Sequence, residues 1–109
     1  MAHSLKVISK RSTFVLVRSK GKFIKGESFN LQFLENSILE NRIYVGYTAT
    51  KRLGNAVKRN KAKRIMRELA KKVITKYGKI NSYYVLIAKT KIFEIAFEAQ
   101  KNELKKLIS

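Results

Sequence analysis

The feature that most constrains the fold is a helical pattern of apolar residues over positions 56–77. At 100° per residue, six apolar side chains fall on one side of a helix: Ala62, Ile65, Met66, Leu69, Val73 and Tyr77. Gly78 is a suitable end for this helix. Apolar side chains in a stripe of this length have to be buried in a hydrophobic core. The segment therefore predicts a helix that packs on another element.

Three other segments have the pattern of strands. Residues 28–33 and 43–50 alternate between apolar and more polar side chains, which predicts two strands with one core face and one wetter face each. Residues 82–89 are almost continuously apolar, which predicts a central strand covered on both faces. Residues 93–108 have the apolar spacing of an amphipathic helix. The order of these elements predicts one α+β domain over residues 1–109, with residues 1–8 flexible.

The segment at residues 12–18 is ambiguous. Its β-branched and aromatic side chains favour a strand. Alternatively, Ser9 or Ser12 caps a short helix that ends before Gly21. Propensity alone favours the strand.

The charge of the chain indicates a polyanionic partner. The 109 residues include 25 Lys and Arg but only 7 acidic residues, all Glu, for a net charge of +18. Nucleic acid is the first candidate for such a partner. The longest apolar run, residues 83–88, is far shorter than the ~20 residues of a membrane helix. No cysteine is present, which excludes disulfides and thiolate metal sites.

The acidic residues do not form a catalytic or metal-binding group. Only Glu94 and Glu98 share a face of the expected C-terminal helix, and Lys101 and Lys105 follow on the same side, as on a solvated face. His3 is the only histidine, so one chain cannot form a histidine-based triad. We therefore expect no catalytic residue and no metal site in the protein.

Residues 51–72 carry half of the net charge. They contain ten bases and a single acid, for a net charge of +9. Opposite the apolar stripe, four side chains recur along roughly 16 Å of helix: Asn60, Arg64, Arg67 and Lys71. An ordinary solvated face mixes both signs of charge, so this segment predicts phosphate binding.

The same segment resembles the signature of the ribonuclease P protein family of bacteria. Residues 51–68 read KRLGNAVKRNKAKRIMRE, where the family has approximately K-K-x-G-N-A-V-x-R-N-R-x-K-R-x-x-R-E. Lys61 departs from the pattern, because an Arg is usual there; the charge is kept but the planar fork is lost. Phe14 and Gly21 match an aromatic residue of the family's first helix and the glycine that ends it.

The resemblance implies a fold. The family has a two-layer α/β sandwich of about four strands and three helices, with a left-handed βαβ crossover, whereas about 98% of such crossovers are right-handed. It also implies that residues 12–18 are helical, against their propensity, and we adopt the helix as the expectation.

The resemblance also implies a function. Family members are the protein subunit of ribonuclease P, a ribonucleoprotein endonuclease that removes the 5′ leader of precursor tRNA. The RNA subunit performs the hydrolysis with Mg²⁺, and no cofactor is expected on the protein. The implied partners are the catalytic RNA and precursor tRNA. No membrane partner, a monomeric free protein and a cytoplasmic location are expected.

Two groups of site residues follow from the resemblance. The positions that match the basic segment and are expected to contact the catalytic RNA are Lys51, Arg52, Asn55, Lys58, Arg59, Asn60, Lys61, Lys63, Arg64, Arg67 and Lys71. The positions expected to line a cleft for the leader are Phe14, Arg18, Asn30, Gln32 and Thr48. Arg18 and Gln32 replace aromatic residues that are frequent in the family, so we expect less base stacking here and more polar contact.

Other classes of protein remain as alternatives. The hypothesis of a ribosomal or other structural RNA-binding protein explains the charge and size equally well, but it does not account for the G-N-A-V-x-R-N spacing. A DNA-binding architectural protein usually reads a groove through a recognition helix or ribbon. A membrane-surface protein is disfavoured because the core needs the apolar stripe. Residues 1–26 contain no acid and resemble a transit peptide, but their removal would also remove Phe14.

Overall fold

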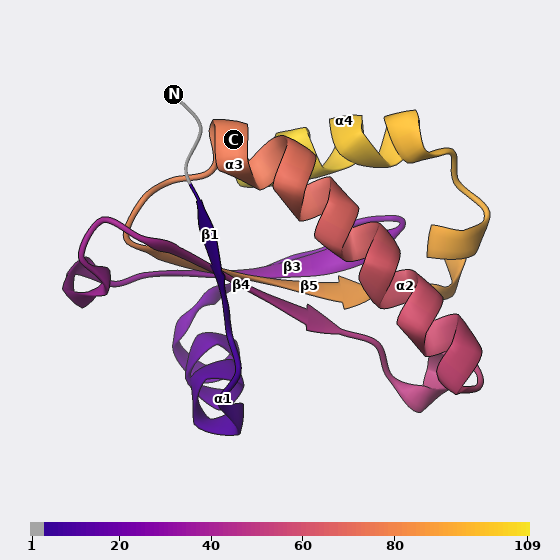
Figure 1. Cartoon of the computed structure of the whole chain (residues 1–109), viewed down its shortest axis with the longest axis horizontal. Coiled ribbons are helices and arrows are strands. Elements are labelled where there is room, and N and C mark those ends of the chain that lie inside the picture. The colour runs from indigo at the N-terminus through magenta and orange to yellow at the C-terminus, as the bar shows by residue number, and fades with distance from the viewer. Residues whose placement is uncertain (1–3) are drawn as a thin grey trace.

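A five-stranded sheet forms the centre of the computed structural model, which describes residues 4–109 (Figure 1). The strands are β1 (Leu5–Val7), β2 (Lys22–Ile24), β3 (Phe29–Glu35), β4 (Ile43–Thr48) and β5 (Ser82–Ala88). Their order in the sheet is β1-β4-β5-β3-β2. β1 and β5 run parallel to β4, whereas β3 pairs antiparallel with β5 and β2 antiparallel with β3.

The sheet has one strand more than the expected four. β1 and β2 are three residues long, which is too short for a periodic pattern to reveal them. β1 also corrects the expectation for the N-terminus, because Leu5–Val7 pair with β4 although residues 1–8 were expected to be flexible. His3 lies outside the described residues.

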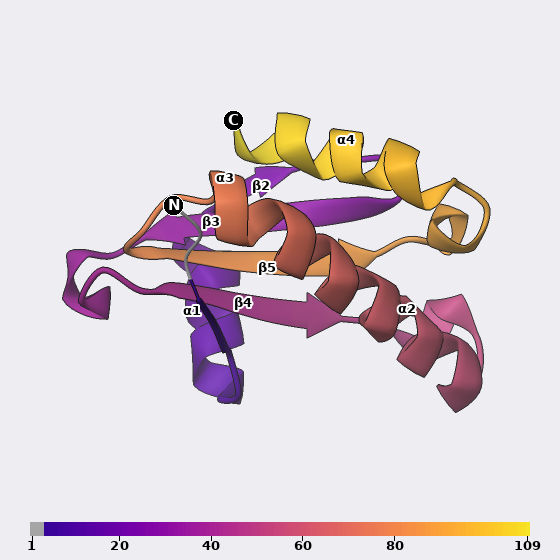
Figure 2. The ribbon, with the colours of Figure 1, turned by 45° about the horizontal axis from the view of Figure 1, so that its top comes forward.

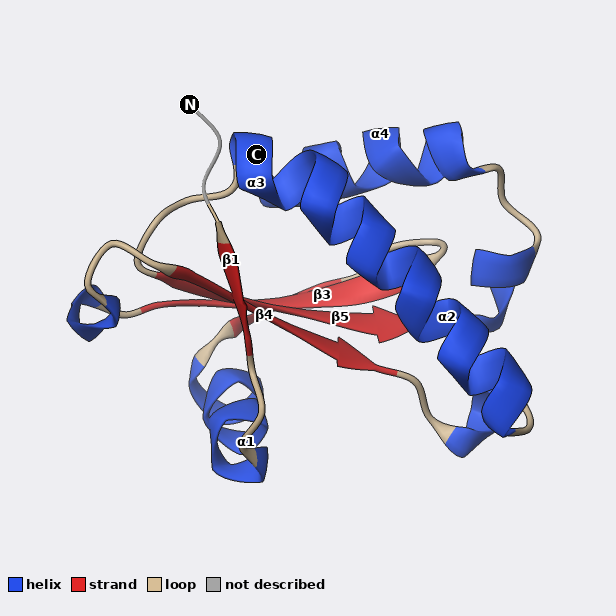
Figure 3. Ribbon diagram, viewed as in Figure 1, coloured by secondary structure: helices blue, strands red, loops and turns tan. Residues whose placement is uncertain are grey.

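Three helices accompany the sheet, as expected. They are α1 (Arg11–Lys20), a long rod of α2 (Ala56–Leu69) and α3 (Thr75–Tyr77), and α4 (Phe97–Ile108). Short 3₁₀ turns lie at Ser37–Leu39, Lys51–Leu53 and Thr90–Phe93 (Figure 3). Within residues 4–109, none of the helices has the length and apolar character needed to cross a membrane.

The helix at α1 confirms what the resemblance implied, so the preference for a strand based on propensity was wrong. Tertiary packing decides this element, because α1 buries Val17 fully against the sheet. The helix ends at Gly21, where a Cβ atom would lie 2.5 Å from the carbonyl oxygen of Phe33. Only glycine lets the chain pass this closely over β3 before it turns into β2.

Helices cover both faces of the sheet (Figure 2). The α2–α3 rod and α4 lie on one face, and α1 lies on the other, where Val17 packs with Ile8 and Val85. The expected two-layer arrangement is therefore corrected to three layers. The reason lies in β5, which is buried on both faces and needs a cover on each, as its continuous apolar pattern predicted.

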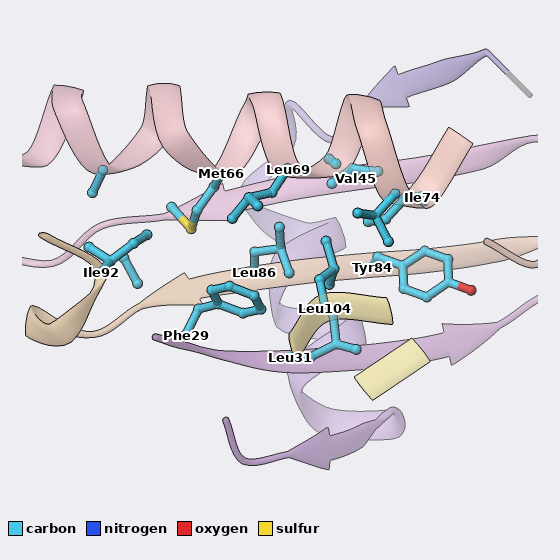
Figure 4. Packing of buried hydrophobic residues seen from close by; sticks show 14 of the residues in the cluster. Phe29, Leu31, Val45, Met66, Leu69, Ile74, Tyr84, Leu86, Ile92 and Leu104 are labelled. Carbon is cyan, nitrogen blue, oxygen red and sulfur yellow. The ribbon is translucent and has the colours of Figure 1, made fainter. Parts of the chain in front are cut away.

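The main core lies between the sheet and the α2–α3 rod and α4 (Figure 4). Phe29 and Leu31 of β3 are fully buried there, as the predicted alternation requires, while Phe33 on the same face is half-buried. Ser28, which the alternation placed on the wetter face, is fully buried instead, because it lies just before β3 where the turn is fastened to α4. Met66 and Leu69 supply the apolar stripe of α2, and Leu104 comes from α4. The outer surface of α2 is thereby directed away from the sheet.

The rod contains a π-helical turn at Ala70–Ile74, between α2 and α3. A π turn takes more residues than an α turn, so the side chains that follow it are rotated about the helix axis. Ile74 is consequently fully buried, although the α-helical stripe omitted it. Tyr77, which the stripe included, is 45% exposed beside α4 instead.

The C-terminal helix begins later than expected. α4 starts at Phe97, so Glu94 precedes it and does not share a helix face with Glu98. Glu98 pairs with Lys101 at 3.1 Å. Glu103 has a structural role, because its carboxylate accepts hydrogen bonds from the backbone N–H groups of Glu27 and Ser28 and so fastens the β2–β3 turn to α4.

Candidate nucleic-acid interface

The basic segment forms a continuous outer surface on α2 and the turn before it. Nine of the eleven residues expected to contact RNA are exposed, and only Arg59 and Lys63 are half-buried. Ala62, Met66 and Leu69 on the opposite side of α2 are fully buried. The helix therefore holds its basic side chains in solvent while its apolar stripe fixes its orientation on the sheet.

Two residues of the signature shape the start of α2. The side-chain oxygen of Asn55 accepts a hydrogen bond from the backbone N–H of Lys58 at 3.0 Å, so Asn55 is the N-cap. Gly54 has a φ of +124°, a conformation that other residues rarely adopt. Both residues build the sharp entry into the helix, and the positive end of the helix dipole adds to the field of the nearby bases.

The acidic residues do not neutralise this surface. Among residues 4–109, the ion pairs join Glu40 to Arg42, Glu35 to Lys79 and Glu98 to Lys101, and none involves a base of residues 51–72. Burial raises the pKa of Tyr47, while the positive charge of Arg67 nearby acts in the opposite direction. A dense set of unpaired charges of one sign attracts a polyanion.

Lys61, the position that departs from the family signature, lies on the flank of α2 that faces the chain before α4. Its ammonium nitrogen is 6.0 Å from the centre of the Phe93 ring, the outer limit of a cation–π contact. The residue therefore leans away from the row that contains Arg64 and Arg67.

A second, polar surface lies on the α1 side of the sheet. Strand register places Thr48 beside Ile87 and Ile87 beside Asn30, and the next row on this face joins Gly46, Val85 and Gln32. The three strand residues predicted for the cleft thus come together on one face. We call the surface formed by Phe14, Arg18, Asn30, Gln32 and Thr48 the cleft face.

Phe14 rests directly on the backbone of β4. A Cβ atom at Gly46 would lie 2.5 Å from Cε1 of the Phe14 ring, so glycine is required for this contact. The ring is half-buried, and Arg18 is exposed one helical turn further along α1. Phe14 is therefore neither a fully buried core residue nor a free surface residue.

Asn30 has a structural contact as well as a place in the cleft face. Its side-chain oxygen accepts a hydrogen bond from the backbone N–H of Gly26 at 3.1 Å. This contact orients the amide and leaves its NH₂ group available as a donor.

An open hollow of about 670 Å³ joins the two surfaces. It lies where β4 and β5 end, and it is lined by Asn30, Thr50, Lys51, Arg52, Leu53, Ile87, Ala88, Lys89 and Thr90. The ammonium group of Lys89 donates to the carbonyl oxygen of Gly26 at 2.8 Å, which holds this charge at the wall. One cleft residue and two bases of the basic segment therefore share a single concave surface.

Sequence reasoning missed two residues at these surfaces. Lys89 was counted only as the end of a strand, although a base directly after a buried strand marks the rim of a sheet. Phe23 is 59% exposed on β2 and pairs in register with Gln32, which places it on the α1 side of the sheet. Because β2 is only three residues long, no pattern in the sequence revealed this placement.

The described residues contain no cluster of three or more histidine, cysteine or acidic side chains that could hold a metal ion. The expectation that the protein binds no metal stays a prediction. The surfaces described above offer cations, amides and aromatic rings, which are the groups that contact phosphates and unpaired bases.

Comparison with known proteins agrees with this chemistry. Residues 3–109 match the family described as Ribonuclease P. A ribonuclease P protein component of Thermoanaerobacter sp. (strain X514) is 31% identical over 108 residues, which cover 99% of this chain and 90% of that protein. The component of Caulobacter vibrioides (strain NA1000 / CB15N) is 36% identical over 89 residues, which cover 80% of this chain and 59% of that protein.

The fold is similar to that of solved structures. The RNase P protein from Thermotoga maritima superimposes with a TM-score of 0.80 at 26% sequence identity, covering 94% of each chain. Since the family match spans nearly all of the sequence and the relatives and the fold agree with it, this chain belongs to the Ribonuclease P protein family.

Proposed function

We propose that this chain is the protein subunit of a ribonuclease P, which binds a catalytic RNA and the 5′ leader of precursor tRNA during removal of the leader. The observation that carries the proposal is the unneutralised outer surface of α2, which bears the family signature and meets the cleft face at the hollow. A structural RNA-binding protein would account for the outer surface of α2, but it would not account for the cleft face.

The outer surface of α2 is suited to the catalytic RNA. Its arginines can each form two hydrogen bonds with a phosphate, and its lysines act as point charges. Such contacts release counterions and do not depend on base sequence. They therefore provide affinity and position rather than recognition of a particular sequence.

The cleft face is suited to a single strand. Phe14 offers a partly exposed ring for stacking, while Asn30, Gln32 and Thr48 offer hydrogen-bonding groups beside it. Arg18 adds a charge for the backbone of the strand. The unpaired leader of precursor tRNA has the chemistry that this surface fits.

The chemistry of cleavage is assigned to the RNA subunit with Mg²⁺. Four of the seven glutamates have contacts within the protein: Glu35, Glu40, Glu98 and Glu103. The protein's residues accordingly bind and orient RNA, without taking part in bond cleavage. As part of the same proposal, the protein is cytoplasmic, binds no cofactor and is a monomer when free.

The family fold also implies that the crossover from β4 through α2 to β5 is left-handed. β4 and β5 are parallel neighbours, so the chain between them crosses one face of the sheet. Figure 2 supports the left-handed sense, because α2 passes in front of the sheet and β5 lies above β4 while both strands point to the right.

Reconstitution tests the proposed function. The chain is mixed with a bacterial ribonuclease P RNA and precursor tRNA at a Mg²⁺ concentration too low for the RNA alone to act. We expect cleavage at the leader junction that depends on the protein. Tight binding to the RNA without any gain in cleavage would instead indicate a structural RNA-binding protein.

A further inference from the structure

Four lysines converge beside Tyr77 on the side of the molecule opposite the cleft face. Lys72 and Lys76 come from the α2–α3 rod, and Lys101 and Lys105 come from α4. Together with Tyr77 they line a hollow of about 240 Å³ between the two helices. We call these four residues the α3–α4 lysine cluster.

Two of the lysines are close to the aromatic ring of Tyr77. The ammonium nitrogen of Lys105 lies 4.4 Å from the centre of the Tyr77 ring, and that of Lys76 lies 5.6 Å from it. Lys105 lowers the pKa of the Tyr77 hydroxyl through a hydrogen bond and through its charge, and the charge of Lys76 adds to the effect. The ring thus lies in a concentrated positive field.

The cluster carries a net positive charge. Glu98 is the one acid that lines the hollow, and it pairs with Lys101 at 3.1 Å. Each helix places its two lysines four residues apart, a spacing at which like charges repel each other. A bound polyanion relieves this repulsion on both helices at once.

The position of the cluster identifies the polyanion. α3 continues the rod of α2 and lies beside the last turns of α4 (Figure 1). At 1.5 Å per residue, the row of side chains from Asn60 to Lys71 is about 16 Å long. Continued to Lys76 in the cluster, the same rod is about 24 Å long. An RNA seated along α2 meets the cluster next, whereas a leader in the cleft face lies on the far side of the sheet.

We propose that the α3–α4 lysine cluster binds the phosphodiester backbone of the catalytic RNA and lengthens the interface on α2 beyond the family signature. The proposal rests on the proposed function. Its ligand is a phosphate backbone, since ammonium groups without an array of base-reading amides carry little sequence information.

The test compares two double variants with equal loss of charge. Lys76→Gln with Lys105→Gln removes the two lysines beside Tyr77, and Lys6→Gln with Lys25→Gln removes two exposed lysines elsewhere that have no ion-pair partner among residues 4–109. Binding to the catalytic RNA is measured over a range of salt concentrations. We expect the first pair to reduce the slope of log K against log salt by about 1.4–1.8, and the affinity near 0.15 M salt by about 20-fold.

The control pair should change neither quantity appreciably. Thermal melts of both variants check that they fold, and the NMR signal of labelled Tyr77 in the wild type should shift when the RNA binds. Unchanged RNA binding by the Lys76 and Lys105 variant would show that the cluster is only a solvated surface and would overturn the inference.

Two further measurements separate this inference from the proposed function. If Arg64→Ala weakens RNA binding while the cluster variant does not, the proposed function stands and the inference is wrong. If the cluster variant binds the catalytic RNA normally but its holoenzyme loses affinity for precursor tRNA, the cluster binds the substrate and the inference is also wrong. If no variant on α2 or in the cluster changes RNA binding, both proposals fail.

Discussion

The outer surface of α2 and the cleft face differ in how their residues are assembled. On α2, neighbours in space are three or four positions apart in sequence, and most of them are exposed bases. The cleft face takes its residues from α1, β3 and β4, and they are mostly half-buried and uncharged. One surface is made by a single helix, and the other exists only after the sheet and α1 have packed.

This difference has a functional consequence. Charges act over about 8–10 Å at physiological salt, so the α2 surface tolerates small errors of position. Stacking and hydrogen bonding act only at contact distance, so the cleft face depends on the exact seat of Phe14 on Gly46. A single substitution on the cleft face should therefore weaken RNA binding strongly. A single substitution on the α2 surface should weaken RNA binding by a small step.

The largest effect is expected from Gly46→Ala. The new Cβ would lie 2.5 Å from the Phe14 ring, so the ring has to move. We expect a loss of about 1–3 kcal/mol in the free energy of unfolding, measured by urea denaturation, because the site is overpacked. Affinity of the holoenzyme for precursor tRNA should also fall, while the salt slope for the catalytic RNA stays unchanged. A variant with wild-type stability would show that the ring is not seated as described.

Phe14→Leu separates stacking from packing. Leucine fills much of the volume but has no aromatic face, so the loss of one stacked base, about 1–3 kcal/mol, should weaken precursor tRNA binding by roughly 5- to 150-fold. Binding of mature tRNA, which lacks the leader, is the control and should barely change. Equal losses for both RNAs would remove Phe14 from the leader site.

Phe14→Ala serves as the companion variant. A fully buried Phe→Ala change costs about 3–5 kcal/mol, and the half-buried ring should cost less. A thermal melt that collapses would place Phe14 in the core.

Arg64→Ala and Arg67→Ala test the gradual response of the α2 surface. Each should reduce the slope of log K against log salt for the catalytic RNA by about 0.7–0.9, and the affinity near 0.15 M salt by about fivefold. Precursor and mature tRNA should be affected alike, in contrast to the Phe14 variants. If both variants keep the wild-type slope, these arginines do not contact phosphates.

The smallest effect is expected from the glutamates. Glu94→Gln should leave the turnover of the reconstituted enzyme unchanged, because the chemistry is assigned to the RNA. A variant that binds RNA normally but has no turnover would contradict this assignment. Glu103→Gln should lower the thermal stability of the protein, since it weakens the contact with the β2–β3 turn, without lowering turnover of the folded enzyme.

Much of α2 and its surface could be predicted from the sequence. The α-helical period and the excess of bases are local properties, and the structure confirms the helix where they placed it. The alternation in β3 likewise predicted the burial of Phe29 and Leu31. These features depend on residues a few positions apart, so a single sequence is enough to read them.

Other features were decided only by the tertiary structure. Propensity favoured a strand where α1 forms, because it does not include the burial of Val17 or the close passage of Gly21 over β3. The α-helical stripe assigned Tyr77 to the core, but the π turn brings Ile74 there and leaves Tyr77 among lysines of two helices.

The sequence by itself determined that the chain has an amphipathic basic helix, strands with one wetter face, and a charge that requires a polyanion. The tertiary structure decided which face α1 covers, how Phe14 meets Gly46, and which lysines of α3 and α4 come together. The physical reason is the range of the interactions. Backbone hydrogen bonding and side-chain periodicity act between near neighbours, whereas the burial of both faces of β5 joins segments that are far apart in the chain.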